Sequence, residues 1–298
     1  ELPGQYINVG IAEQNGAGLA AGLATCGKIP FVVTYAVFGS LRMCEMIRQE
    51  ICYPNLNVKI ACSHGGVTPA NDGASHQAIE DMGVLRTIPN MTVIMPADYN
   101  SARKLVRQAA EVYGPVYLRF TRDAIPQIYD EDVEFTIGKA HAIQDGKDVA
   151  IIANGDTVRL AIEAAKELAG KGISARVLDM HTIKPLDEEI VIRAARETGA
   201  IVTSEEAKPG TAGEGVLSGE RRGSGTVVVE DKNSGTVSVN GNYVVLEVLP
   251  EGCTVEECLR QRAGHGPYSM EDQGRWFDLA IARHCPEGAA VVFAPHAL

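Results

Sequence analysis

The sequence predicts an α/β protein whose sheets are mostly parallel. Short apolar runs bounded by turn residues, such as FVVTYAVF and DVAIIANG, alternate with segments of helical period such as SARKLVRQAAEVYG. This alternation is typical of βα units. The 298 residues are 45% hydrophobic and 22% charged, so the chain can bury one large or two ordinary cores.

Composition and charge exclude several classes of protein. The net charge of −11 disfavours nonspecific binding to nucleic acid or to an anionic membrane. The sequence has neither a spanning run of about 18 to 20 apolar residues nor a signal segment. Its seven cysteines form no CxxC pair, which is typical of reduced thiols. We expect a cytoplasmic protein, and the start at Glu1 inside a pattern indicates that the natural N-terminus is missing.

Residues 1–128 predict the first α/β unit. Small and apolar residues cover nearly every face of Ile11–Thr25, which predicts a buried helix closed by Gly27. The next elements are expected in the order strand FVVTYAVF, helix LRMCEMIRQEIC, strand NVKIACSHGG, a glycine-rich loop, helix AIEDMGVLRTIP, strand MTVIMPAD, helix SARKLVRQAAEVYG and strand PVYLRFTR.

A linker and a second α/β unit follow. Residues 129–147 contain an acidic cluster and no sustained period, which predicts a linker that ends in a short strand pair. Residues 148–206 then predict three strands and two helices, and Pro185 is expected near the first turn of the second helix. These elements are the strand DVAIIANG, the helix TVRLAIEAAKELAGKG, the strand SARVLDM, the helix KPLDEEIVIRAARETG and the strand AIVTSEE.

The character of the chain changes over residues 207–298. This tail is rich in glycine, and the run GTVVVEDKNSGTVSVNGNYVVLEV predicts hairpins with NSG and NGN turns. The spacing of Cys253, Cys258 and the pair His284-Cys285 is irregular. We therefore predict no metal site from these side chains.

The segment GIAEQ places Glu13 in the opening turn of an otherwise apolar helix. A carboxylate there is often only a solvated group that is favourable with the helix dipole. The alternative function is a carboxyl held in a partly apolar cleft, where it can share a proton with a ring nitrogen.

The segment TYAVFGSL places Tyr35, Phe38 and Leu41 at i, i+3 and i+6 just after a strand, around a turn that contains Gly39. Such side chains are usually core residues. The alternative is an aromatic platform for a flat heterocycle.

Two histidines and an aspartate lie close together in CSHGG and NDGASHQ. His64, Asp72 and His76 follow a strand on glycine-rich loops, and ligands of open α/β sheets bind beyond the carboxyl ends of the strands. The spacing matches no zinc pattern. Hydrogen bonding to a polyhydroxylated substrate, with histidine as acid or base, fits these residues better.

Two arginines, Arg119 and Arg122, end the strand in YLRFTRDAIP. Surface ion pairing is the simpler interpretation. A guanidinium at the carboxyl end of a strand is also suited to binding a phosphate.

Taken together and in order, INVGIAEQN, TYAVF, SHGG, DGASHQ, GPVYLR, LDMHTIKPLD and IVTSEE resemble the transketolase family, and more narrowly the C-terminal half of that enzyme. The resemblance implies a pyrimidine-binding domain over residues 1–128, a linker over 129–147, part of the C-terminal domain over 148–206 and a divergent tail over 207–298. PANDG stands where the family usually has GEDG.

The resemblance also implies the roles of individual residues. Glu13 would hydrogen-bond the aminopyrimidine of thiamine diphosphate, and Tyr35, Phe38 and Leu41 would contact that ring. His64, Asp72 and His76 would bind the hydroxyls of a ketose, the two histidines would assist proton transfer, and Arg122 would hold its phosphate. The implied reaction transfers a two-carbon ketol unit from a ketose phosphate to an aldose phosphate.

The implied enzyme needs a partner. The family's pyrophosphate-binding domain and its GDG…N magnesium motif are not found in this sequence. Thiamine diphosphate and Mg²⁺ (or Ca²⁺) would therefore be held with an N-terminal subunit, and two copies of this half would pair within a heterotetramer. Two alternatives remain: half of a 1-deoxy-D-xylulose-5-phosphate synthase, and a noncatalytic dimerisation or regulatory module. The synthase typically lacks a histidine at the position of His64.

Overall fold

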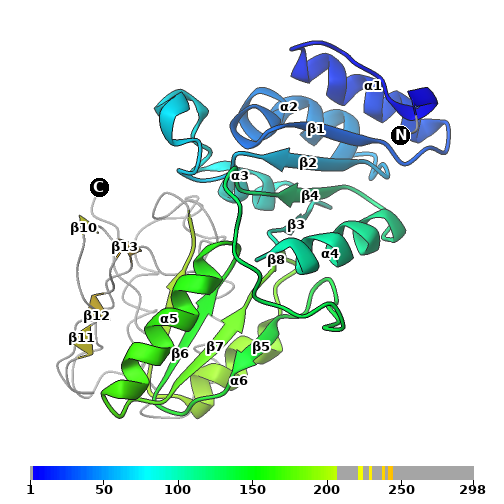
Figure 1. Ribbon diagram of the computed structural model, residues 1–298. Coiled ribbons are helices and arrows are strands. Elements are labelled where there is room, and N and C mark those ends of the chain that lie inside the picture. The colour runs from blue at the N-terminus through cyan, green and yellow to red at the C-terminus, as the bar shows by residue number, and fades with distance from the viewer. Residues whose placement is uncertain (1–2, 207–220, 224–227, 230–236, 239–240, 244–298) are drawn as a thin grey trace, which may run out of the picture.

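The computed structural model describes residues 3–206 and four short strands of the tail, over 221–223, 228–229, 237–238 and 241–243. Residues 3–206 form two α/β units, one above the other in Figure 1. The sheets are mixed but mostly parallel, as the sequence predicts.

The first unit contains a five-stranded sheet in the order β1-β2-β4-β3-β8. The four strands β1 to β4 are parallel where they pair. The last strand, β8, comes from the second half of the chain and pairs antiparallel with β3. The bounds are β1 Phe31–Tyr35, β2 Lys59–Ser63, β3 Thr92–Ile94, β4 Val116–Arg119 and β8 Thr182–Lys184.

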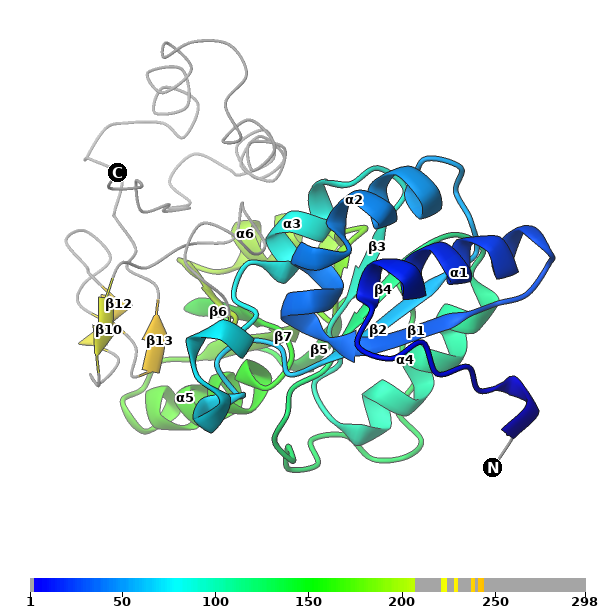
Figure 2. The ribbon, with the colours of Figure 1, turned by 90° about the horizontal axis from the view of Figure 1, so that it is seen from above.

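The helices of the first unit surround this sheet (Figure 2). Residues Phe38–Cys52 form a helical run with π-type hydrogen bonding at both ends, and short 3-10 turns carry the glycine-rich loop. The bounds are η1 Pro3–Gln5, α1 Glu13–Thr25, η2 Phe38–Arg42, α2 Cys44–Met46, η3 Ile47–Cys52, η4 Ala70–Asp72, η5 Ala74–His76, α3 Asp81–Thr87 and α4 Tyr99–Glu111.

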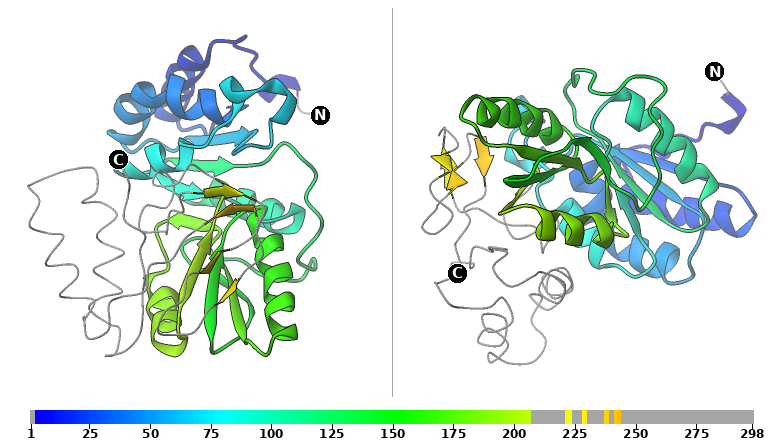
Figure 3. Two further views of the ribbon diagram at one scale, coloured as in Figure 1. Left: turned by 90° about the vertical axis from the view of Figure 1, so that its left-hand side faces the viewer. Right: turned by 90° about the horizontal axis from the view of Figure 1, so that it is seen from below.

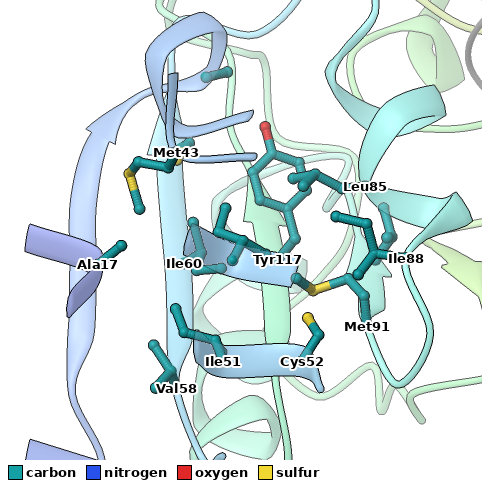
Figure 4. Packing of buried hydrophobic residues seen from close by; sticks show 14 of the residues in the cluster. Ala17, Met43, Ile51, Cys52, Val58, Ile60, Leu85, Ile88, Met91 and Tyr117 are labelled. Carbon is teal, nitrogen blue, oxygen red and sulfur yellow. The ribbon is translucent and has the colours of Figure 1, made fainter. Parts of the chain in front are cut away.

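One hydrophobic cluster joins these helices to the sheet. Ala17 of α1 and Met43 of the helical run lie on one side of Ile60 of β2, and Tyr117 of β4 lies on its other side, near Leu85 (Figure 4). All five side chains are buried. The helix α1 is rich in alanine and glycine, and a Cβ atom on Gly16 would lie 3.9 Å from Val32 Cγ1 of β1.

The second unit contains a four-stranded sheet in the order β5-β7-β6-β9. The strands β6, β7 and β9 are parallel where they pair, and β5 is antiparallel to β7. Its two helices, α5 and α6, cover opposite faces of the sheet (Figure 3). The bounds are β5 His141–Gln144, β6 Val149–Ala153, α5 Thr157–Gly170, β7 Ala175–Asp179, α6 Glu188–Glu197 and β9 Ile201–Ser204.

The two units share a hydrophobic core. Leu105 and Leu118 of the first unit belong to the same buried cluster as Val158 and Val177 of the second. Tyr129 of the linker lies in that cluster too, and its hydroxyl donates to Asp179 Oδ2 at 2.7 Å. The linker is therefore packed between the units.

Three local expectations are wrong. The helix α1 is buried on one face only: Ala17 and Ala20 are buried, whereas Leu19 on the outer face is 38% exposed. The linker ends in the single strand β5, which pairs with β7. The helix α6 begins at Glu188, after Pro185, because the preceding residues form β8 and Asp187 caps the helix by accepting from Ile190 N.

Two antiparallel pairs are described in the tail. The strand β11, Val228–Val229, pairs with β12, Val237–Ser238, which confirms the first predicted hairpin. The strand β13, Gly241–Tyr243, pairs with β10, Arg221–Gly223. The prediction of a second hairpin with an NGN turn is therefore wrong, because β13 has a different partner strand. The cysteines considered above in the tail lie outside the described residues. In the described part of the chain, every helix is too short or too polar to cross a bilayer.

Candidate functional site

The candidate site lies at the carboxyl edge of the first sheet. Tyr35 ends β1, His64 directly follows β2 and Arg122 comes three residues after β4. Because these strands are parallel and adjacent, the segments that follow them meet at one edge. Figure 2 shows this edge from above, with the loop that carries η4 and η5 beside it.

Four rings that the sequence singled out form a contiguous cluster. The rings of Tyr35 and His64 stack with centroids 3.8 Å apart and an interplanar angle of 22°. The rings of His76 and Phe38 form a T-shaped pair with centroids 5.3 Å apart, and the rings of Tyr35 and Phe38 are nearly parallel with centroids 6.3 Å apart. The structure therefore brings together residues 41 positions apart in the chain, from Tyr35 to His76.

Glu13 joins this cluster through an arginine that the sequence did not single out. Its carboxyl Oε2 lies 3.3 Å from Arg42 Nη1, and the Glu13 side chain is 7% exposed. The guanidinium carbon of Arg42 lies over the ring of Phe38, 4.8 Å from its centroid. One cation thus contacts both the carboxylate and the aromatic platform.

Gly39 allows the platform to sit close to the sheet. A Cβ atom there would overlap Cys62 Sγ of β2. The turn expected around Gly39 is the helical segment η2, and Leu41, on that segment, is 48% exposed.

His64 adopts a left-handed backbone conformation, with φ of 63°. Such a conformation costs on the order of 1 kcal/mol in a residue other than glycine and is frequent at functional sites. Its Nδ1 shares a hydrogen bond of 2.9 Å with Ser63 Oγ. Partial desolvation, and then the positive charge of Arg122, lower the pKa of the His64 imidazole. The ring is therefore neutral near pH 7 and can accept or donate a proton.

Arg122 is held over the same loop. Its Nη1 donates to the Pro69 carbonyl at 2.7 Å and lies 3.7 Å from Asp72 Oδ2, and both charged side chains are about one-third exposed. The Arg122 backbone N–H donates to Thr68 Oγ1. The guanidinium is thus positioned but still accessible.

Arg119 has a different place, and the prediction that it could bind a phosphate is wrong. Its side chain is fully buried and donates from Nε to Asp81 Oδ2 at 2.8 Å. It also donates from Nη2 to the carbonyl oxygens of Ala78 and Glu206. Arg119 is the last residue of β4, the central strand of the sheet. Its position inside this strand, and not after it, is the feature of the sequence that could have predicted its burial.

Comparison with known proteins connects this geometry to a family. Residues 2–127 match the transketolase pyrimidine-binding domain and residues 138–222 the transketolase C-terminal domain. The solved structure of a split-gene transketolase, an inactive β4 tetramer, is 48% identical to this chain, with a TM-score of 0.67 and with 71% of this chain and 69% of that chain covered. This chain belongs to the transketolase family.

Two curated relatives in this family are separate subunits or sections. The 6-deoxy-6-sulfo-D-fructose transketolase subunit SqwH of Clostridium sp. (strain MSTE9) is 46% identical over 70% of this chain and 64% of its own length. The putative transketolase C-terminal section of Methanocaldococcus jannaschii is 48% identical over 64% of this chain and 61% of its own length. The chain thus spans less than two thirds of the length of these two relatives.

Proposed function

We propose that this chain is the pyrimidine-domain subunit of a thiamine-diphosphate-dependent transketolase that transfers a two-carbon ketol unit between sugar phosphates. The observation that carries the proposal is the contiguous cluster of Glu13, Arg42, Phe38, Tyr35 and the two histidines. A scattered arrangement of these side chains would favour a noncatalytic module. Their convergence supports an enzyme.

The residues present fit the pyrimidine end of the cofactor. Glu13 offers a nearly buried carboxylate to a ring nitrogen, and Phe38 offers the ring face that Arg42 does not cover. One face of Tyr35 is already covered by His64, which leaves its other face and Phe38 for stacking; Leu41 is the third proposed contact. Bound thiamine diphosphate supplies the nucleophilic carbon that takes up the ketol unit. Glu13 would hold or release the proton at the ring nitrogen.

The second half of the site fits a hydroxylated phosphate ester. His64 and His76 present their imidazole rings next to the platform, where they would bind hydroxyls of the donor and move its hydroxyl proton. Asp72, 3.7 Å from the Arg122 guanidinium, would bind a further hydroxyl of the donor. Arg122 would bind the phosphate of the sugar, for which a guanidinium is well suited.

Partners are part of the proposal. We propose an N-terminal, pyrophosphate-domain subunit that holds the diphosphate and Mg²⁺, and pairing of this chain with a second copy. Phe31 and Val33 are two residues apart on the edge strand β1, so they share a face, and they are 40% and 74% exposed. Adjacent exposed apolar side chains are a feature of protein interfaces, and they support the pairing.

Reconstitution tests the function. The purified chain is mixed with a transketolase N-terminal subunit, thiamine diphosphate and Mg²⁺, and ketol transfer from a ketose phosphate to an aldose phosphate is measured. We expect activity only when both subunits are present. Product formed from pyruvate and glyceraldehyde 3-phosphate, without ketol transfer, would instead identify a deoxyxylulose-phosphate synthase half. Inactivity of every pairing would contradict the proposal.

Replacing Arg122 should separate phosphate binding from chemistry. In the reconstituted enzyme, Arg122→Ala should raise KM for a phosphorylated donor about 10-fold or more, because a charged hydrogen bond of about 1.5–3 kcal/mol is lost. KM for an unphosphorylated ketose should change little. Arg103→Ala, an exposed arginine of α4, is the matched control. Equal effects on both donors would contradict the assigned role.

A further inference from the structure

The loop that carries His64 is fastened from across the boundary between the two units. Glu206, two residues after β9 of the second unit, accepts a hydrogen bond on Oε1 from Val67 N at 2.8 Å. Its main-chain carbonyl accepts from Arg119 Nη2 at 2.8 Å. Glu206 is 4% exposed. Its contact with Arg119 is buried and its contact with Val67 is partly buried, so water weakens both less than it would weaken a surface hydrogen bond.

The loop is shaped to receive this carboxyl group. Gly66 has a φ of 67°, and a Cβ atom on it would overlap the Glu206 carboxyl group. Gly66 N donates to Ala78 O at 2.7 Å, and Thr68 Oγ1 donates to Gly65 O. Residues 65–68 thus connect the segment after His64 to the segment after His76. Glu206, from the second unit, binds this loop at Val67.

We propose that Glu206 is a positioning residue for ketol transfer: it holds the loop 65–68, and through this loop the placement of His64 and Arg122. This inference rests on the proposed function for its catalytic consequence. The connection is short, since Val67 is three residues from His64. On the other side, Thr68 Oγ1 accepts from Arg122 N at 3.1 Å. Glu206 acts through the loop.

The surroundings of Glu206 show which form of its carboxyl group fits. The carboxyl groups of Asp156, before α5, and Glu206 raise or lower each other's pKa, and a hydrogen bond between two carboxyl groups requires that they share a proton. Burial, and then the charge of Asp156, raise the pKa of Glu206 to about 7. The charges facing this pair are Arg119 from β4, Arg159 from α5 and Asp81 beyond Arg119. A neutral Glu206 still accepts from Val67 N and donates to Asp156.

This arrangement makes the glutamine variant the informative one. Glu206→Gln keeps an oxygen for Val67 N–H and an N–H for Asp156, whereas Glu206→Ala removes both. Thr198→Val is the matched control within the second unit: Thr198 is buried and its Oγ1 donates to Ala194 O and Ala200 O, away from the loop. It destabilises the same unit without touching residues 65–68.

Amide hydrogen exchange of the whole chain tests the holding of the loop without need of activity. In Glu206→Ala, protection at residues 65–68 should fall about tenfold or more, in line with a lost hydrogen bond to a shielded acid. In Glu206→Gln and Thr198→Val it should stay within about threefold of the original chain after correction for global stability. Unchanged loop protection in Glu206→Ala, or a loss shared equally with β6 and β9, would overturn the inference.

The reconstituted enzyme tests the consequence for the site. Glu206→Ala should lower kcat/KM for the phosphorylated donor about tenfold or more, and Glu206→Gln should restore most of it. Equal activity of the alanine variant and the original chain would overturn the positioning role. If the original pair itself shows no ketol transfer, the proposed function fails, whereas the exchange result still decides whether Glu206 holds the loop.

Discussion

Glu13→Gln should slow ketol transfer by orders of magnitude in the reconstituted enzyme. Under the proposed function, Glu13 exchanges a proton with the pyrimidine nitrogen, and a positioned acid–base group contributes on the order of 10²- to 10⁴-fold to a rate. An amide in its place keeps the shape and a hydrogen bond but cannot exchange that proton. We expect kcat to fall by this factor and KM for the donor to change little.

The surroundings of Glu13 allow a clean control for this experiment. Its side chain is nearly buried and touches Arg42, so Glu13→Gln removes one charge at the site. Glu111→Gln removes one charge from the exposed end of α4 instead and should leave kcat unchanged. Subunit assembly, measured by sedimentation of both variants with the N-terminal partner, should be unaffected. Turnover retained by Glu13→Gln would remove the residue from the mechanism.

Much of this site could be predicted because each part belongs to a local motif. Glu13 lies at a helix start, Tyr35 ends a strand, and the histidines lie on glycine-rich loops after the next strand. Parallel neighbouring strands bring such loops to one edge. The roles that the resemblance to transketolases implies for Tyr35, Phe38, His64 and His76 require these side chains to meet at that edge.

The unpredicted residues depend on contacts between distant segments. In the sequence, Arg42 is one of several charged residues in a helical run, and nothing in the pattern distinguishes it. The packing of α1 beside η2 places its guanidinium at Glu13. Glu206 meets Val67 from 139 positions away in the chain. The pairing of β8 with β3 likewise joins segments from the two units. No short sequence pattern encodes contacts of this range.

The burial of Arg119 is the clearest example, and it leads to a large effect on stability. Arg119 and Asp81 are both fully buried, and Asp81 Oδ2 also accepts from Tyr117 OH at 2.6 Å. Removing one partner of such a pair leaves the other charge in a medium of low dielectric without compensation. Arg119→Met should therefore lower the free energy of unfolding by about 3–5 kcal/mol, measured by chemical denaturation of the isolated chain.

The double variant shows whether the loss comes from the stranded charge or from lost packing. Asp81→Asn removes the charge but keeps an acceptor for Tyr117, so the pair Arg119→Met with Asp81→Asn should be more stable than Arg119→Met alone. Arg107→Met, an exposed arginine of α4, should have an effect within about 0.5 kcal/mol. If the changes in free energy of unfolding caused by the two buried substitutions simply add, the ion pair between Arg119 and Asp81 does not stabilise the fold. A favourable coupling would mean that Arg119 is required because Asp81 is present, and that its contacts with Ala78 and Glu206 depend on the same pair.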